Sequence, residues 1–130
     1  MVLEIINENY KTLKIALDAA FNRAAKGKGA DRHANGRPFD QQPILSIQRD
    51  LGSTQFALGQ IMKKTTELTK FNDDDAKKEL LDIMVYAAAA WVYLDQREKQ
   101  LEFTMTPPDH RDIGICSAPA VAHNRYGELV

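Results

Sequence analysis

The sequence is poor in cysteine, in net charge and in long apolar runs. Cys116 is the single cysteine among 130 residues, which excludes an intrachain disulfide and favours a reducing, cytoplasmic setting. A formal net charge of −1 gives no reason to expect a DNA duplex, an RNA duplex or an anionic membrane as a partner. Glu4 and Glu8 stand where an export signal would carry positive charge, so we expect no signal peptide.

The longest apolar run extends from Ile83 to Leu94 and contains four consecutive alanines, so a helix is its expected conformation. The run is shorter than the roughly 20 residues that a bilayer requires. Asn72 is a suitable N-cap, and prolines follow the run, which predicts one helix over about residues 73–101. Because the run is apolar on every side, we expect Trp91 and Tyr93 in the core or at an oligomer contact.

Three shorter helices are predicted from hydrophobic spacing and turn residues. Residues 7–25 form an amphipathic helix, and residues 43–51 form a short helix bracketed by a proline and a glycine. A third helix, capped by Ser53 or Thr54, continues to the turn at Asn72 and forms an antiparallel hairpin with the long helix. The apolar faces of these helices consist of Tyr10, Leu13, Leu17, Ala20, Phe21, Ala24, Ile44, Leu45, Ile47, Leu51, Leu58, Ile61, Met62, Thr65 and Leu68.

These elements predict an all-α fold. We expect an antiparallel helical hairpin with a long C-terminal helix, packed with the N-terminal helix, and a core completed by homo-oligomerisation. Residues 1–6 are expected to dock as a strand or a staple. An extended C-terminal tail, residues 103–130, is expected to lie on a surface, which leaves residues 1–102 as the helical domain.

The stretch between Lys26 and Pro43 is the least regular part of the helical domain and its strongest candidate for a site. Its glycines let backbone amides approach an anion, and arginine offers a planar fork that matches phosphate oxygens. The GK[ST] spacing of a P-loop is absent. We therefore expect a phosphate-bearing ligand, with a solvated basic loop as the alternative. The candidate cations of this stretch are Lys26, Lys28, Arg32, His33 and Arg37.

Groups suited to a nucleobase lie near these cations in the sequence. Asn35 offers donors for a base edge, and the ring of Tyr10 or Phe39 offers a stacking surface. Lys63 and Lys64 supply further positive charge for phosphates. The predicted site is therefore a nucleotide site, and residues 1–102 form a predicted nucleotide-binding domain.

Three carboxylates form a second candidate site. Glu79 and Asp82 are three residues apart on one face of the long helix, and Glu67 on the preceding helix could face them. Three such acids would bind Mg²⁺ through oxygen ligands. The alternative is that Glu79 forms an ion pair across the hairpin. The lysines available for it are Lys63, Lys64 and Lys78.

The segment Glu79-Leu80-Leu81-Asp82-Ile83, followed by Tyr86, resembles the second metal motif, E-x-x-D, of the all-α MazG-like nucleoside triphosphate pyrophosphohydrolases. The likeness covers residues 56–94. In that family an E-x-x-E motif lies on the partner helix, and the matching stretch here reads Lys64-Thr65-Thr66-Glu67. The resemblance implies Mg²⁺ on Glu67, Glu79 and Asp82, whereas Lys64 puts a cation where the family has its first acid.

A second likeness is to small bacteriophage proteins. It is carried by residues 32–44, together with Gly59-Gln60 and Lys63-Lys64. Short helical proteins of this kind include sponges, which are oligomers that sequester the cyclic nucleotide signals of bacterial immunity such as CBASS. The likeness is one of overall character, and it implies immune evasion in the host cytoplasm.

Three functions follow as hypotheses. The first is non-enzymatic binding and sequestration of a nucleotide, a cyclic dinucleotide immune signal above all, by a phage-encoded homo-oligomer without a cofactor. The second is a MazG-like, Mg²⁺-dependent pyrophosphohydrolase acting on nucleoside or deoxynucleoside triphosphates. The third is a structural or interaction protein whose basic loop contacts an acidic partner. Lys64 distinguishes the first two, because an enzyme needs its position free of positive charge.

Overall fold

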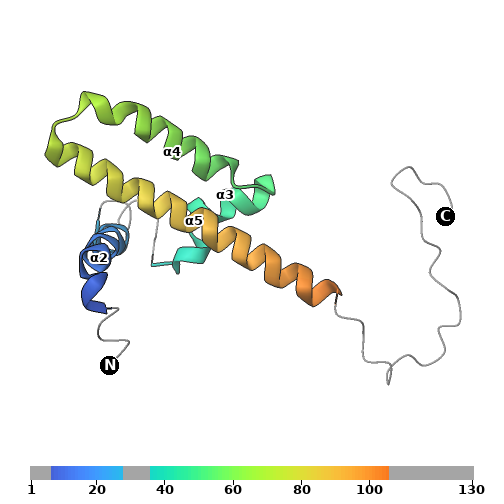
Figure 1. Ribbon diagram of the computed structural model, residues 1–130. Coiled ribbons are helices and arrows are strands. Elements are labelled where there is room, and N and C mark those ends of the chain that lie inside the picture. The colour runs from blue at the N-terminus through green and yellow to red at the C-terminus, as the bar shows by residue number, and fades with distance from the viewer. Residues whose placement is uncertain (1–6, 28–35, 106–130) are drawn as a thin grey trace, which may run out of the picture. The chain divides into compact units, whose positions relative to one another are not determined.

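The computed structural model describes residues 7–27 and 36–105, and every regular element within them is helical (Figure 1). The predicted all-α fold with a long C-terminal helix is therefore confirmed for the described residues. The predicted strand or staple at residues 1–6 lies outside them. The elements are α2 (Lys11–Lys26), the 3-10 turn η2 (Phe39–Gln41), α3 (Pro43–Leu51), α4 (Gln55–Glu67), the 3-10 turn η3 (Leu68–Lys70) and α5 (Asp73–Met105).

The chain divides into two compact units, Met1–Glu98 and Lys99–Val130. The first unit contains α2, α3, α4 and the part of α5 that contacts them. The described part of the second unit is residues 99–105, the last turns of α5. The core, the ion pairs and the cavities described below all lie within the first unit.

Helix α3 begins and ends where its sequence signals predict. Pro43 occupies a first-turn position, where its missing N–H is not needed. Gly52 ends the helix in the left-handed conformation, at φ 67°, which glycine adopts without a steric penalty. The N–H of Gly52 donates to the carbonyl of Arg49, and the N–H of Ser53 donates to that of Gln48. These bonds satisfy the last carbonyls of α3 and turn the chain into α4.

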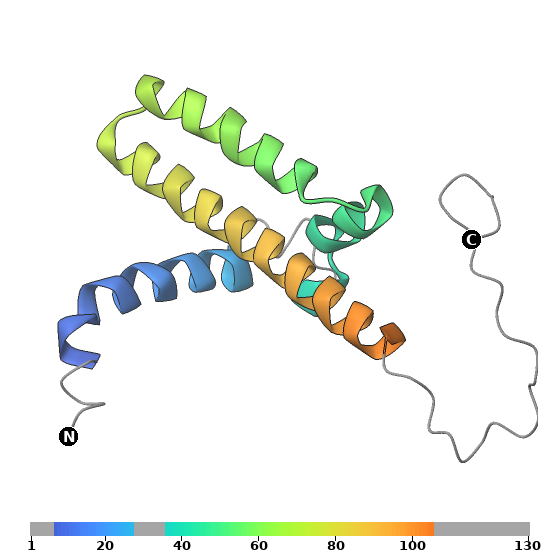
Figure 2. The ribbon, with the colours of Figure 1, turned by 45° about the vertical axis from the view of Figure 1, so that its right-hand side comes forward.

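Helices α4 and α5 form the predicted antiparallel hairpin, and they lie side by side in both views (Figures 1 and 2). Asn72 caps α5, because its Oδ1 accepts the N–H of Asp75 at 2.9 Å. Its Nδ2 donates to the Asp75 carboxylate at 3.2 Å. Thr54 occupies the N-cap position of α4 without a side-chain bond, and the Ser53 hydroxyl accepts the N–H of Gln55. The cap at Asn72 therefore fixes the turn at which the chain enters α5.

Helix α5 is longer than predicted. It runs to Met105, so Phe103, Thr104 and Met105 are helical and not extended as predicted. Because no helix breaker precedes Pro107, the backbone continues its hydrogen-bond pattern to the edge of the described residues. The remainder of the predicted tail, residues 106–130, lies outside the described part of the chain. It contains Cys116, His110 and His123.

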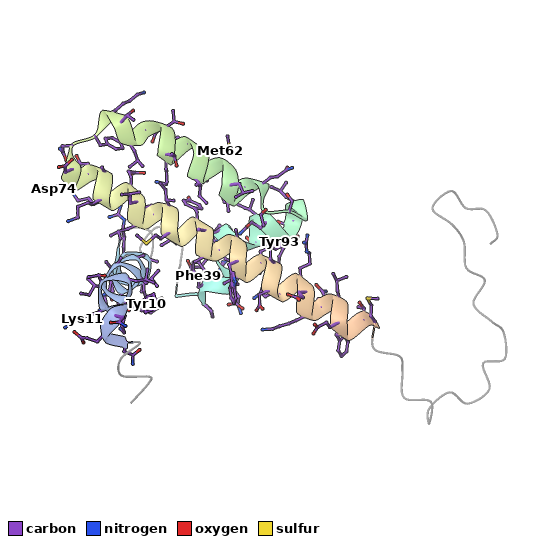
Figure 3. All side chains as sticks on the ribbon, viewed as in Figure 1. Tyr10, Lys11, Phe39, Met62, Asp74 and Tyr93 are labelled. Carbon is purple, nitrogen blue, oxygen red and sulfur yellow. The ribbon has the colours of Figure 1, made fainter. Side chains whose placement is uncertain are left out.

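The core is small and lies where α3 meets the middle of α5. Leu45, Ala89 and Tyr93 are buried, and Phe39, Ile44 and Val92 pack against them. Tyr93 is thus a core residue, as predicted. Trp91 is 66% exposed and lies outside this core. Tyr93 is labelled in Figure 3. Side chains two positions apart on a helix point about 200° apart, so the rings of Trp91 and Tyr93 cannot both face α3. A role for Trp91 at an oligomer contact stays a prediction.

The predicted inward face of α4 is partly wrong. Leu58 is 48% and Met62 71% exposed, whereas Ala57 is fully buried and Lys64 is largely covered. Helix α4 contacts α5 through Lys64, which pairs with two carboxylates there, and through the ring of Phe56, which meets Tyr86. Leu58, Met62 and Thr65 are exposed, whereas the other two predicted residues, Ile61 and Leu68, are half-buried.

The apolar faces of α2 and α3 are likewise only partly covered in the single chain. Ala20 is buried, but the large side chains beside it on α2 are more than half exposed, and so is Leu51 on α3. The predicted homo-oligomer that would cover them stays a prediction. The exposed residues are the N-cap Tyr10 and, on α2 itself, Leu13, Ile15, Leu17 and Phe21.

Candidate ligand-binding site

Four charged side chains join α2, α4 and the N-terminal part of α5. Arg23 on α2 donates through both Nε and Nη2 to the carboxylate of Asp82, with Nη2 and Oδ2 at 3.1 Å. Lys64 on α4 donates to Glu79 at 2.8 Å and to Asp82 at 3.4 Å. Asp82 therefore binds cations from both neighbouring helices. All four side chains are partly buried, between 18% and 35% exposed.

The pKa values reflect this pairing. The hydrogen bond to Asp82 raises the pKa of the Arg23 guanidinium, against a smaller opposing effect of burial. Burial alone would lower the pKa of Lys64, but the hydrogen bond to Glu79 and the two negative charges raise it overall. Burial alone would raise the pKa of Asp82, but Arg23 and Lys64 together lower it. Arg23, Lys64 and Asp82 are therefore charged at neutral pH.

The predicted magnesium site does not fit this arrangement. The Lys64 ammonium lies between Glu79 and Asp82, where it would repel a divalent cation. Among the described residues, no group of three histidine, cysteine, aspartate or glutamate side chains is placed to hold a metal ion. The alternative, an ion pair of Glu79 with a lysine across the hairpin, is confirmed for Lys64. Glu67 lies one turn further along α4 and is half-buried.

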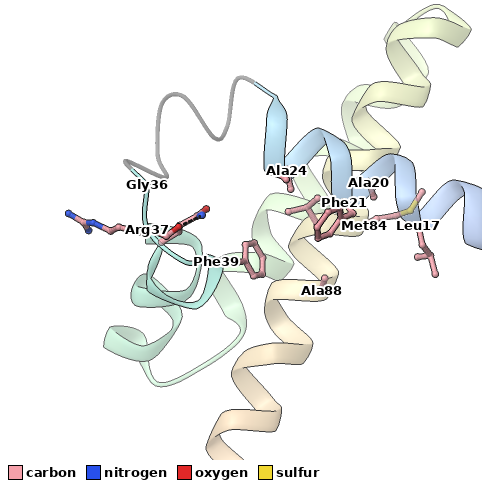
Figure 4. Close-up of a pocket in the computed structure, with 12 residues that line it drawn as sticks. Leu17, Ala20, Phe21, Ala24, Gly36, Arg37, Phe39, Met84 and Ala88 are labelled. Carbon is pink, nitrogen blue, oxygen red and sulfur yellow. Dashed lines mark hydrogen bonds between the residues drawn. The ribbon is translucent and has the colours of Figure 1, made fainter.

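A first cavity of about 650 Å³ lies between α2, α5 and the segment that leads into η2 (Figure 4). Its walls are mostly apolar and carry two phenylalanine rings. The guanidinium of Arg37 points away from the cavity, while the carbonyl of Arg37 accepts a hydrogen bond from Gln42 at 3.0 Å. The lining residues are Leu17, Ala20, Phe21, Ala24, Ala25, Gly36, Arg37, Phe39, Gln42, Met84, Val85 and Ala88.

A second cavity of about 780 Å³ adjoins the first and has different walls. Phe39, Ala24, Gln42 and Val85 line both cavities, so Phe39 stands on their common wall. The rings of Phe56 and Tyr86 meet edge to face, with centroids 6.2 Å apart. The other lining residues of this second cavity are Arg23, Gly27, Pro43, Ile44, Lys64, Lys78 and Asp82.

The predicted ligand-binding residues are only partly brought together. Arg37 and Phe39 line the first cavity, and Phe39 and Lys64 line the second. Tyr10, the N-cap residue of α2 (labelled in Figure 3), is 60% exposed and lines neither cavity. Lys26 and Lys63 are exposed and line neither cavity. The predicted residues outside the described part of the chain are Lys28, Arg32, His33 and Asn35.

Several site residues were not predicted from the sequence, and Arg23 is the most important of them. Asp82 directly precedes the long apolar run, and a carboxylate placed there needs a counter-charge. Arg23 follows the buried Ala20 by three residues and so lies on the same side of α2. These two signals could have paired α2 with α5. Phe21, Gln42 and Tyr86 carry no comparable local signal.

Comparison with protein-family models, with curated proteins and with solved structures finds no match for this chain. Its described helices include none that is long and apolar enough to cross a membrane. Function must therefore be argued from the two cavities and the ion cluster.

Proposed function

We propose that this protein binds and sequesters a nucleotide ligand without hydrolysing it, with a cyclic dinucleotide as the leading candidate. The observation that carries the proposal is the pair of cavities that share Phe39. One has apolar walls with two phenylalanine rings, and the other has cations on its walls. A nucleotide combines the two matching chemistries, a planar base and anionic phosphates.

The first cavity suits a base. Phe21 and Phe39 both line it, and a base stacked on an aromatic ring gains about 1–3 kcal/mol. The volumes of both cavities fall within the range of roughly 300–1,000 Å³ that is typical of small-molecule sites. Arg37 at the rim gives a further positive charge, and its guanidinium points away from the cavity.

Binding without turnover is supported by the state of the acids. Hydrolysis by the MazG-like route would need Glu79 and Asp82 to hold Mg²⁺, but both carboxylates are engaged by Lys64, and Asp82 also by Arg23. Metal binding would require Arg23 and Lys64 to leave these carboxylates, and the loss of the partly buried ion pairs would oppose it. The acids serve here to join α2 and α4 to α5.

The biological part of the proposal rests on sequence. The likeness of residues 32–44 to small bacteriophage proteins supports a phage-encoded sponge that removes an immune signal. The exposed apolar faces of α2 and α5 support a homo-oligomer, because exposed patches of this kind mark contact surfaces.

The test is to recover the ligand. The protein is incubated with Mg²⁺ and a panel of cyclic dinucleotides and of nucleoside and deoxynucleoside triphosphates, then denatured, and the released compounds are identified by chromatography. We expect one or more cyclic dinucleotides to be retained and returned intact. Steady pyrophosphate release would favour the pyrophosphohydrolase instead. Retention of no nucleotide would favour the third hypothesis, an interaction protein.

A further inference from the structure

The residues that line the second cavity carry more positive than negative charge. Arg23 from α2, Lys64 from α4 and Lys78 from α5 line it, whereas Asp82 is its only acidic lining residue among those described. Glu79, which accepts from Lys64, is not among the lining residues. Three cations from three helices and one carboxylate therefore line this cavity of about 780 Å³, and two of the cations are paired with that carboxylate.

These cations have hydrogen-bond donors to spare within the described part of the chain. A guanidinium has five N–H groups, and Arg23 directs two of its nitrogens at Asp82. An ammonium has three N–H groups, of which Lys78 uses one, on Asp75 at 3.3 Å. Lys64 uses two, on Glu79 and Asp82. The remaining donors can serve an anion that enters the cavity.

We propose that the second cavity is the phosphate subsite, which binds phosphate groups of the ligand through Arg23, Lys64 and Lys78. The inference rests on the proposed function and deepens it, because it assigns base and phosphates to opposite sides of Phe39. It also moves the phosphates from the loop around Arg37, where the sequence suggested them, to the ion cluster.

Lys78 is the residue on which to test the subsite. Its side chain is 60% exposed and pairs with an exposed carboxylate of its own helix, so its loss has little effect on stability. Lys77 is its neighbour on α5, is also exposed, and does not line the cavity. Lys77→Gln is therefore a matched control for Lys78→Gln, with the same change of charge at a position one residue away.

The experiment is calorimetric titration of the full chain with inorganic pyrophosphate and with the cyclic dinucleotide that is retained best. We expect Lys78→Gln to weaken both by roughly fivefold, which corresponds to about 1 kcal/mol, and Lys77→Gln to change neither. Lys78→Glu should weaken both further. Circular dichroism on each variant checks that the helices are retained.

The possible results separate the two proposals. A nucleotide that binds equally well to wild type and to both Lys78 variants would overturn the subsite and leave the proposed function standing. Equal weakening by Lys77→Gln and Lys78→Gln would also overturn the subsite, since it would indicate general electrostatic attraction. Pyrophosphate binding that depends on Lys78, without binding of any nucleotide, would support a subsite for free phosphate anions and overturn the proposed function.

Discussion

The two cavities on either side of Phe39 differ in the forces that built their walls. The first is bounded by apolar side chains of α2 and α5, and it has no ion pair among the residues that line it in the described chain. The second contains the Arg23–Asp82 and Lys64–Asp82 pairs. The first cavity is thus suited to an uncharged ring, and the second is suited to an anion. The proposed nucleotide ligand would match both walls, with its base on one and its phosphates on the other.

Substitution of Phe39, which lines both cavities, should have the largest effect. Phe39→Ala should destabilise the protein by about 1–3 kcal/mol, less than a fully buried phenylalanine, because Phe39 is half-buried against the core. It should also weaken nucleotide binding by roughly tenfold or more through lost stacking, while pyrophosphate binding changes little. Urea unfolding and calorimetry measure the two effects. Phe71→Ala, which removes a ring that lines neither cavity, should leave both ligands unaffected.

Asp82 is the next most sensitive position. Asp82→Asn removes the charge that pairs with Arg23 and Lys64, and we expect a loss of about 1–3 kcal/mol of unfolding free energy after allowance for partial exposure. The same change releases Arg23 and leaves Lys64 paired with Glu79 alone, so pyrophosphate should bind more tightly. Asp74→Asn, a change at the exposed second residue of the same helix, is the control for stability. Weaker pyrophosphate binding by Asp82→Asn would contradict the phosphate subsite.

Acid should remove the contribution of Asp82 to stability. Its pKa is lower in the folded protein than the value of about 3.9 in an unfolded chain, so the unfolded state takes up protons first as pH falls. The stabilisation is complete above pH of about 4 and is lost as pH falls through the folded pKa. The difference in unfolding free energy between wild type and Asp82→Asn should therefore be constant from pH 7 to 5 and shrink below about pH 4. A difference that persisted at pH 2 would show that the charge is not its cause.

Helix boundaries were predictable because their signals are local. Pro43, Gly52 and Asn72 each determine the conformation of a few neighbouring residues, and all three act as predicted. The end of α5 was missed because the residues before Pro107 are compatible with either a helix or an extended chain. The direction of each helix face was not predictable from hydrophobic spacing alone. On α4 the inward face carries both Phe56, whose ring meets Tyr86, and Lys64, which pairs with Glu79 and Asp82.

The candidate site shows the same limit. Phe39 and Arg37 were found because their neighbourhood is rich in glycine and cations, a pattern that is visible in a short stretch. Arg23 and Asp82 are separated by 59 residues, and only the fold brings them together. Lys64 was assigned to a ligand and, as an alternative, to an ion pair. It forms the ion pair and also lines the second cavity.

Arg37 should have a smaller effect on binding than the residues of the second cavity. Its side chain is exposed and points away from the first cavity, so Arg37→Ala should weaken nucleotide binding by no more than about threefold, the scale of an exposed charge interaction. Arg49→Ala, an exposed arginine on α3, is the matched control in the same titration. A loss of tenfold or more would place a phosphate at Arg37 and weaken the division of roles between the cavities.

Trp91 should have the smallest effect within one chain. Because its ring is 66% exposed, Trp91→Ala should change the unfolding free energy of a monomer by less than about 1 kcal/mol. If the predicted homo-oligomer covers this ring, the variant should instead shift light-scattering mass toward the monomer at micromolar concentration. An unchanged mass in wild type and variant would remove Trp91 from the oligomer contact.

The central claim is that one ligand places its base beside Phe39 and its phosphates beside Arg23. Nuclear magnetic resonance can follow the Phe39 ring and the Arg23 Nε–H group in a single titration with the retained cyclic dinucleotide. We expect both signals to shift together with the nucleotide, Arg23 alone to shift with pyrophosphate, and Phe39 alone to shift with the matching nucleoside. A nucleotide that shifts Phe39 and leaves Arg23 unchanged would contradict it.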